Sequence, residues 1–185
     1  MDQDRRDRVR AHYAQQWGKP LASVSARENK GRLDPAFAIE VRHPSKRRAL
    51  WTYSTVGMSA DRCRGAIEAH LVSGVQCDDA SVFWLTILAY FHLTGEKLGL
   101  EHTVDFGAPW LPGSRLDHGY LSLPYLDGPE LEWQRGPDGD VQHLWLIPIT
   151  RAERALKRER GAEALEQLFE RAPLAYDDPF RASLC

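Results

Sequence analysis

Two stretches of the chain combine histidine with carboxylates at spacings that suit acid–base or metal chemistry. The residues concerned are Asp117 and His118, and then Asp127, Glu130, Glu132 and His143. A carboxylate beside an imidazole can orient the ring for proton transfer. Two carboxylates with a histidine can bind a divalent cation. One hypothesis is therefore a metal-dependent or His/Asp hydrolase that uses residues 117–118 and 127–143.

The same residues have a simpler interpretation, which we favour. Short polar side chains commonly fix loops by hydrogen bonding, and a loop rich in carboxylates is usually solvated. The chain contains no phosphate loop, zinc-protease helix or nucleophile elbow; Gly57–Ser59 comes nearest but lacks the closing glycine. Cys63, Cys77 and Cys185 form no CxxC pair, so we expect reduced thiols. We predict no enzyme, no catalytic residue, no metal and no cofactor.

Composition excludes further classes of protein. The 185 residues carry a net charge of −2, whereas a dedicated nucleic-acid binder usually has a strong basic excess. The first residues contain no apolar segment typical of a secretion signal. The longest apolar run, Ala80–Leu93, is too short to span a bilayer. We therefore expect a cytoplasmic protein that binds neither nucleic acid nor membrane.

Hydrophobic periodicity predicts the elements that must position these residues. We expect a helix over 2–17, where Val9, Tyr13 and Trp17 form one stripe, and a loop over 18–35. The remaining expected elements are strands over 36–43, 49–57, 65–72, 102–106, 119–123 and 141–149, and helices over 78–94, 150–160 and 162–172. This order favours a single α+β domain, with a mostly antiparallel sheet and helices packed against it. Residues 1–34 are expected to be an extension of a domain over 35–185.

Particular residues make these expectations specific. Thr150 and Glu153 fit a capping box, and Gly161 divides the last helical region. Gly95 is expected to end the 78–94 helix with a positive φ, and that helix, apolar nearly all round, to be buried on most of its surface. Trp110 lies between prolines in a loop, where it either plugs the core or anchors a partner, the core role being favoured.

Five segments in order resemble the bacterial suppressor of fused domain family. They are LWTYSTVGMS at 50–59, VDFGAPWLPGSRLDHGYLSLPYLDGPEL at 104–131, HLWLIPIT at 143–150, GAEALEQLFE at 161–170 and DDPFRASL at 177–184. The resemblance covers about residues 35–185. It implies a mixed α/β fold with no established catalytic site. Larger eukaryotic members bind a short motif of a transcription factor as an added β-strand, and many bacterial members are encoded beside polymorphic toxins and look like immunity proteins.

The function expected from this resemblance is a non-catalytic protein-binding module, an immunity protein that neutralises a cognate toxin domain encoded nearby. The predicted partner-binding residues are Trp110, Asp117, His118, Tyr125, Asp127, Glu130 and Glu132. A strand edge at Ser122–Tyr125, where Pro124 cannot donate to a ladder, is expected to accept a peptide strand. The acidic loop is expected to meet a basic partner. A self-associating structural adaptor is a further alternative.

Overall fold

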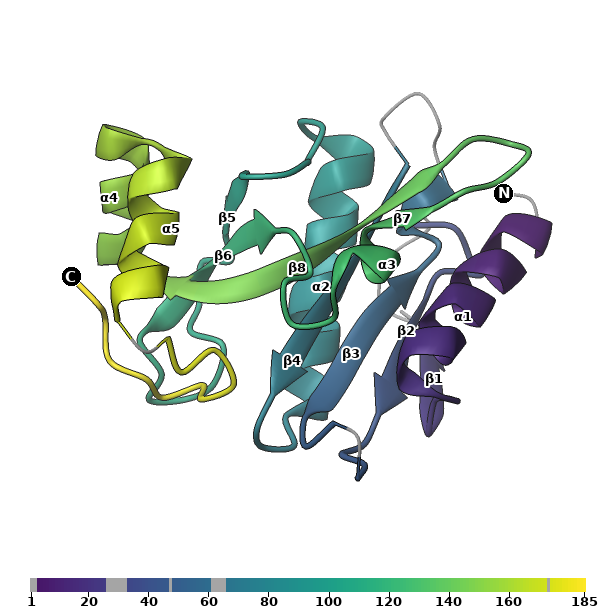
Figure 1. Ribbon diagram of the computed structural model, residues 1–185, viewed down its shortest axis with the longest axis horizontal. Coiled ribbons are helices and arrows are strands. Elements are labelled where there is room, and N and C mark those ends of the chain that lie inside the picture. Colours follow the sequence, from purple (N-terminus) through teal and green to yellow (C-terminus); the bar gives the residue numbers. More distant parts are fainter. Residues whose placement is uncertain (1–2, 26–32, 47, 61–65, 173) are drawn as a thin grey trace.

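The computed structural model describes residues 3–25, 33–46, 48–60, 66–172 and 174–185. One mixed sheet runs through the molecule, with helices on both of its faces (Figure 1). The strands are β1 (Ala22–Ser25), β2 (Ala38–Arg42), β3 (Trp51–Val56), β4 (Ile67–Ser73), β5 (Thr103–Asp105), β6 (Leu116–Ser122), β7 (Trp133–Gln134) and β8 (Val141–Thr150). The helices are α1 (Gln3–Trp17), α2 (Asp78–Thr94), α3 (Pro129–Glu132), α4 (Arg151–Arg160) and α5 (Ala162–Arg171), with a 3₁₀ turn η1 (Met58–Ala60).

The sheet has the strand order β1-β2-β3-β4-β8-β6-β5, and β7 also pairs with β8. All of these pairs are antiparallel except β4 with β8. The α+β class and the mostly antiparallel sheet are therefore confirmed. None of the helices in the described ranges is both long and apolar enough to cross a membrane.

The predicted helix boundaries are confirmed where local chemistry sets them. Thr150 accepts a hydrogen bond from the Glu153 amide at 3.3 Å, and the Glu153 carboxylate accepts one from the Thr150 amide at 2.8 Å. Gly161, with φ of 89°, separates α4 from α5. Gly95 does end α2, but its φ is −109°, so the expectation of a positive φ was wrong. The helix ends there without the left-handed residue that many helix termini use.

Three short elements were not predicted. β1 lies within the expected loop over 18–35, and it is exposed along its whole length. Its sequence lacks apolar alternation, so only the pairing of Ala22–Ser25 with β2 makes it a strand. α3 is a single turn and β7 has two residues, both shorter than any hydrophobic period can indicate.

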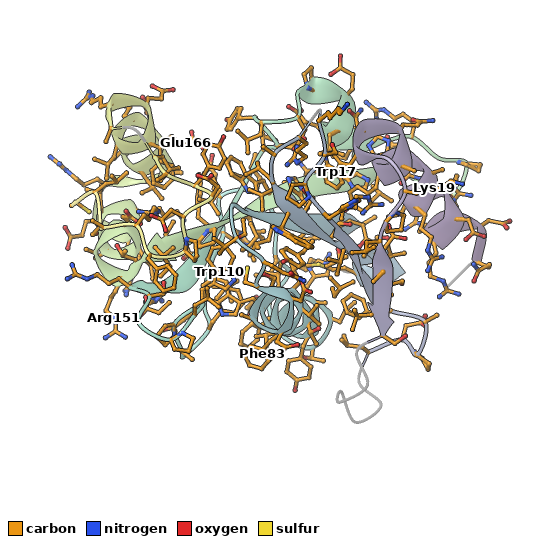
Figure 2. All side chains as sticks on the ribbon, turned by 90° about the horizontal axis from the view of Figure 1, so that it is seen from below. Trp17, Lys19, Phe83, Trp110, Arg151 and Glu166 are labelled. Carbon is orange, nitrogen blue, oxygen red and sulfur yellow. The ribbon has the colours of Figure 1, made fainter. Side chains whose placement is uncertain are left out.

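One face of the sheet is apolar and is covered by α2. Side chains alternate between the two faces of a strand, and on this face Ile39, Leu71 and Leu146 join the cluster that contains Trp84 of α2. Phe83, on the outer side of α2, is 52% exposed (Figure 2). The expectation that α2 is buried on most of its surface therefore holds only for the side that faces the sheet.

The other face of the sheet changes character along β8. Under α5 it is apolar, and Trp145, Ile147 and Ile149 pack with Leu165. Under α1 it is polar, with buried side chains of Glu40, Arg42, Thr52, Ser54, Glu68, His70 and His143. Both faces of β8 are covered, which agrees with its nearly continuous apolar sequence.

Helix α1 packs on this polar half of the sheet. Val9 and Tyr13 are fully buried, which confirms the predicted stripe. Arg5 and Arg8 both pair with Asp138 in the 136–139 turn before β8. Residues of the expected N-terminal extension thus contact the sheet through α1 and extend it through β1. The division at residue 34 stays a prediction.

A buried carboxylate holds the turn after β3. Glu68 accepts hydrogen bonds from the hydroxyls of Thr55 and Ser59, both at 2.6 Å, and from the amides of Gly57, Met58 and Ser59. Burial raises the pKa of Glu68, although these hydrogen bonds oppose the shift. Gly57–Ser59 is therefore a strand-to-loop turn that Glu68 of β4 holds in place.

Candidate functional site

The edge strand β5 offers backbone groups for pairing with another chain. The strand order places β1 and β5 at the two edges of the sheet, and among the described residues β5 pairs only with β6. Strand β6 lies between β5 and β8, and its pairing reaches Ser122 on the β8 side. The expected strand edge over Ser122–Tyr125 was wrong, because β6 ends at Ser122 and residues 123–125 lie outside any strand. Leu121 itself exchanges hydrogen bonds with Glu101 and His102.

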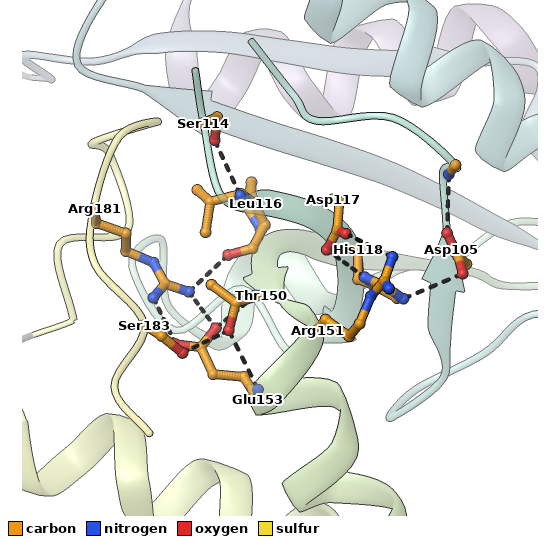
Figure 3. A network of polar contacts seen from close by, with 12 residues as sticks. Asp105, Ser114, Leu116, Asp117, His118, Thr150, Arg151, Glu153, Arg181 and Ser183 are labelled. Carbon is orange, nitrogen blue, oxygen red and sulfur yellow. Dashed lines mark hydrogen bonds and ion pairs between the residues drawn. The ribbon is translucent and has the colours of Figure 1, made fainter. Parts of the chain in front are cut away.

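A polar network stands at the end of β5. The buried ring of His118 has Nδ1 at 2.6 Å from Asp117 Oδ1 and Nε2 at 3.3 Å from Asp105 Oδ2. Arg151, at the start of α4, reaches Asp117 at 3.4 Å (Figure 3). The Gly107 amide donates to Asp105 at 2.9 Å and is the main cause that lowers the pKa of Asp105, with the nearby basic groups adding to it.

The contacts of His118 decide what this network can do. Both ring nitrogens face carboxylates, and in its contacts among the described residues neither faces a serine or cysteine. An activated nucleophile needs its base within hydrogen-bond reach, which these contacts do not provide. The network instead fixes two carboxylates beside the strand edge. The side chain of Asp105 is 49% exposed and that of Arg151 80% exposed, so both charges are open to a partner.

A second network braces this region from the C-terminal segment. Arg181 donates to both oxygens of Glu153, at 2.6 and 2.8 Å, and to the Pro148 carbonyl at 2.9 Å. The Leu184 amide donates to the same carboxylate at 3.0 Å. Burial alone favours the neutral acid, but the hydrogen bonds and charge of Arg181 dominate and lower the pKa of Glu153. The start of α4, which carries Arg151, is thus held rigidly against β8.

Trp110 is placed in the core near this network. It is 2% exposed, its ring lies 5.9 Å from that of Trp84, and its Nε1 lies 3.4 Å from Ser81 Oγ. The favoured interpretation of Trp110 as a core residue is confirmed. A contact between Trp110 and a partner stays a prediction that requires the loop to move.

The remaining predicted site residues lie elsewhere and do not form one acidic surface. Tyr125 and Glu130 are exposed and Glu132 is half-buried. The carboxylate of Asp127 is only 5% exposed, because it pairs with Arg48 and accepts a hydrogen bond from Trp17 Nε1 at 2.7 Å. The charge of Asp127 is therefore neutralised within the fold.

His70 and His143 lie beneath α1 next to this ion pair. His70 Nε2 is 3.6 Å from Asp127 Oδ2, and burial lowers the pKa of His70 to about 4. The His143 ring lies 4.6 Å from that of His12 and 4.8 Å from that of Tyr13, and burial lowers its pKa well below the usual value. Both rings are neutral at pH 7.

The contacts argue against the hydrolase hypothesis. The pair Asp117–His118 contacts Asp105 and Arg151, whereas Asp127 contacts Arg48 and α1, and the two sets share no contact. Within the described ranges, no group of three or more His, Cys, Asp or Glu side chains is arranged to hold a metal ion. The convergence on one pocket that this hypothesis requires is absent from the described part of the chain. Cys77 and Cys185 are free thiols, and Cys63 lies outside that part.

Sequence reasoning missed the partners that only the fold supplies. Arg48, Trp17 and His70 come from three separate elements, and no spacing connects them to Asp127. Arg181 had a signal, since it lies in the terminal segment that carried the family resemblance. The polar network around His118 was indicated by the adjacent Asp117, but no spacing in the sequence connects its other carboxylate, Asp105, to His118.

Comparisons with known proteins agree with this architecture. The family model described as Suppressor of fused protein (SUFU) matches residues 33–182. A SUFU homolog from Neisseria gonorrhoeae FA 1090 is 26% identical over 100% of this chain and 98% of that chain, with a TM-score of 0.84. No curated protein matches the chain.

Two more distant structures share the fold. The Sufu–Fu complex matches at 12% identity over 97% of this chain and 92% of that chain, with a TM-score of 0.71. Drosophila Suppressor of Fused matches at 13% identity over 97% of this chain but 50% of that chain, with a TM-score of 0.65. The match of the family model over most of the sequence, together with the expected order of segments, shows that this chain belongs to the suppressor of fused family.

Proposed function

We propose that this chain is a protein-binding module whose partner adds a strand to the free edge of β5. The carrying observation is that this edge ends beside two exposed, oppositely charged side chains, those of Asp105 and Arg151. An extended peptide that joins a sheet edge gains main-chain hydrogen bonds, while neighbouring side chains select its sequence. The network around His118 holds Asp105 and Asp117 in place for this selection.

The comparisons support a binding role at the family level. One relative is a Sufu in a complex with Fu. The resemblance of the sequence to bacterial members found beside toxins leads us to a finer proposal, an immunity protein that neutralises a cognate toxin domain by direct binding. No feature of the fold selects a toxin over another protein, so the partner must be found by experiment.

Hydrogen exchange on the complex tests the binding mode. Neighbouring gene products are first screened for stoichiometric binding, and the amides of residues 103–105 are then followed with and without the partner. We expect slower exchange at those outward-facing amides of β5 that the partner strand covers. Unchanged exchange in a saturated complex would overturn strand addition at β5.

Charge reversal at Arg151 tests whether the charged side chains beside β5 select the partner. Arg151→Glu is expected to weaken partner binding about tenfold or more, because a like-charge contact replaces an attractive one. Arg158→Glu is the matched control, since Arg158 is an exposed arginine on the same helix. Equal affinities of the two variants would remove Arg151 from the binding surface.

Growth rescue upon co-expression with a neighbouring toxin tests the immunity role. If the chain binds the toxin but does not rescue growth, the immunity role is contradicted.

A further inference from the structure

A hollow of about 550 Å³ opens on the sheet face opposite α2, away from the β5 edge. Its walls come from the end of α1, the segment before β3, the loop after β6 and the C-terminal segment. The lining residues that matter here are Trp17, Arg48, Leu50, Leu126, Tyr176 and Asp177. Four distant parts of the sequence therefore meet around one open space.

The charges that line this hollow do not balance. Arg48 and Asp127 form an ion pair with each other. Asp177 has a half-buried side chain, and in the described part of the chain nothing pairs or hydrogen-bonds with its carboxylate. His70, behind Asp127, is neutral at pH 7 and adds no positive charge. One carboxylate is thus left without a counter-charge.

The backbone holds Asp177 in this position. Its carbonyl accepts a hydrogen bond from the Gly74 amide at 2.7 Å. A Cβ atom at Gly74 would lie 3.1 Å from Asp177 Oδ2, so the absence of a side chain there gives the carboxylate its room. The placement of Asp177 depends on the turn after β4 and not on any polar partner of its side chain.

The Asp127 carboxylate, also in the wall, has one oxygen without a hydrogen-bond donor among the described residues. The side chain of Asp127 is 5% exposed, and its Oδ1 receives the hydrogen bonds from Trp17 and Arg48. Its Oδ2 accepts no hydrogen bond from the described residues and faces His70 Nε2 at 3.6 Å. This oxygen is buried behind the wall, and a terminal nitrogen of Arg48 also has no hydrogen-bond partner among the described residues. The Arg48–Asp127 pair therefore leaves the charge preference of the hollow to Asp177.

The other walls suit an aliphatic chain that ends in a cation. Leu50 and Leu126 offer apolar surface, and the ring of Tyr176 stands edge-on to Trp145 at 5.4 Å. Aromatic faces attract cations, and the guanidinium of Arg48 already lies 5.3 Å from the centroid of the Trp17 ring. Basic side chains commonly lay their methylene groups on apolar surface while the charged end finds a polar partner.

We propose that this hollow binds an arginine or lysine side chain of a protein partner, with Asp177 as its counter-charge. The inference rests on the proposed function only in taking the donor of the side chain to be a protein. An anion would face the unpaired carboxylate of Asp177. A purely apolar side chain would leave the Asp177 carboxylate desolvated without a partner, which is unfavourable.

The test uses the full chain and a small probe, so that it needs no identified partner. N-acetyl-L-arginine amide is titrated against the isotope-labelled protein, and its neutral analogue N-acetyl-L-citrulline amide is titrated in parallel. We expect saturable shifts of the Trp17 indole N–H and of the Leu126 and Asp177 amides, with the citrulline probe binding about fivefold more weakly or worse. Equal binding of the two probes, or no localised shift, would overturn the proposal.

Two conservative variants separate charge from shape. Asp177→Asn keeps the backbone contact with Gly74 and is expected to weaken the arginine probe about fivefold, whereas Glu159→Gln, on the exposed side of α4, leaves its affinity unchanged. Arginine affinity that survives D177N would contradict the role of Asp177. Acetate that shifts the same signals more strongly than arginine would assign the hollow to anions. Neither result touches strand addition at β5, which hydrogen exchange tests separately.

Discussion

Two buried ionic networks lie at different ends of the sheet, one beside α4 and the other beneath α1. In the first, Arg181 donates twice to Glu153, and two backbone amides complete the carboxylate. In the second, Arg48 pairs with Asp127, but one terminal nitrogen of Arg48 and both ring nitrogens of His143 have no hydrogen-bond partner in the described ranges. Both oxygens of Glu153 thus have donors, although Arg181 Nε has no partner in the described ranges, whereas Asp127 keeps one oxygen without a donor.

The difference indicates two roles for buried charge. A carboxylate with its cation and amides in place fixes the C-terminal segment and α4, and removal of one partner leaves a buried charge unpaired. The α1 network instead combines neutral histidines with an ion pair that borders an open hollow. We expect the first region to determine stability over the whole neutral range, and the second to respond to pH and to ligands.

The largest effect is expected at the Glu153 network. Arg181→Met leaves Glu153 ionised and buried, and should cost about 3–5 kcal/mol of the free energy of unfolding. Arg135→Met is the control, because Arg135 pairs with Asp140 at the surface with its side chain 76% exposed, and a loss below about 1 kcal/mol is expected. Urea denaturation at pH 7 measures both. Similar small losses in the two variants would mean that the Glu153 network is not a stabilising scaffold.

The second largest effect is expected to be a pH dependence of stability that comes from the α1 network. Burial lowers the pKa of His70 from 6.5 to about 4, so the unfolded chain binds a proton before the folded chain does. The stability that neutral His70 provides is complete above about pH 6.5, falls as the pH drops, and is lost near pH 4. We expect a decrease of about 2 kcal/mol between pH 7 and pH 5 from this group.

His70→Leu isolates this contribution in denaturation curves across pH 5–7. The variant should lose that part of the pH slope, while the exposed control His43→Gln keeps it. Burial raises the pKa of Glu68, so Glu68 adds stability as the pH falls. This contribution is the same in the wild type and in both variants. Glu153, with its lowered pKa, adds a loss only below about pH 4.5, its ordinary value. A His70→Leu profile parallel to the wild type would contradict the assignment.

A smaller effect is expected where α1 meets Asp127. Trp17→Phe removes the indole N–H that donates to Asp127 at 2.7 Å, and should cost about 1–2 kcal/mol because the acceptor is charged and buried. Trp133→Phe, at a side chain that is 44% exposed, should change stability by less than about 0.5 kcal/mol. Thermal unfolding of both variants measures the difference. A neutral Trp17→Phe would show that α1 is held by its other contacts alone.

The smallest effect is expected at the proposed binding surface. Arg151→Ala removes an exposed pair with Asp117 and should alter stability by less than about 0.5 kcal/mol. The same variant should nevertheless weaken partner binding, which titration calorimetry measures once a partner is found. A large loss of stability would place Arg151 in the scaffold together with Arg181.

Local sequence signals were sufficient for most elements of this fold. The Thr150–Glu153 capping box, the break at Gly161 and the alternation in β2 depend on neighbours within a few residues, so they appear in the sequence as they do in the structure. The exposed strand β1 and the free edge at β5 depend on which strands pair, which the pattern of single segments does not contain. The expected edge at Ser122–Tyr125 failed because β6 ends at Ser122.

The sequence alone determined the class of the fold, the core residues and the family resemblance, because these follow from periodicity and from the order of segments. It also named His118 and Asp127 as residues of interest. Only the tertiary structure decided their partners, since Asp105, Arg48 and Trp17 are brought to them by long-range strand pairing and helix docking. Charge in a folded chain is balanced by neighbours in space, and a hollow such as that beside Asp177 arises only where distant segments meet.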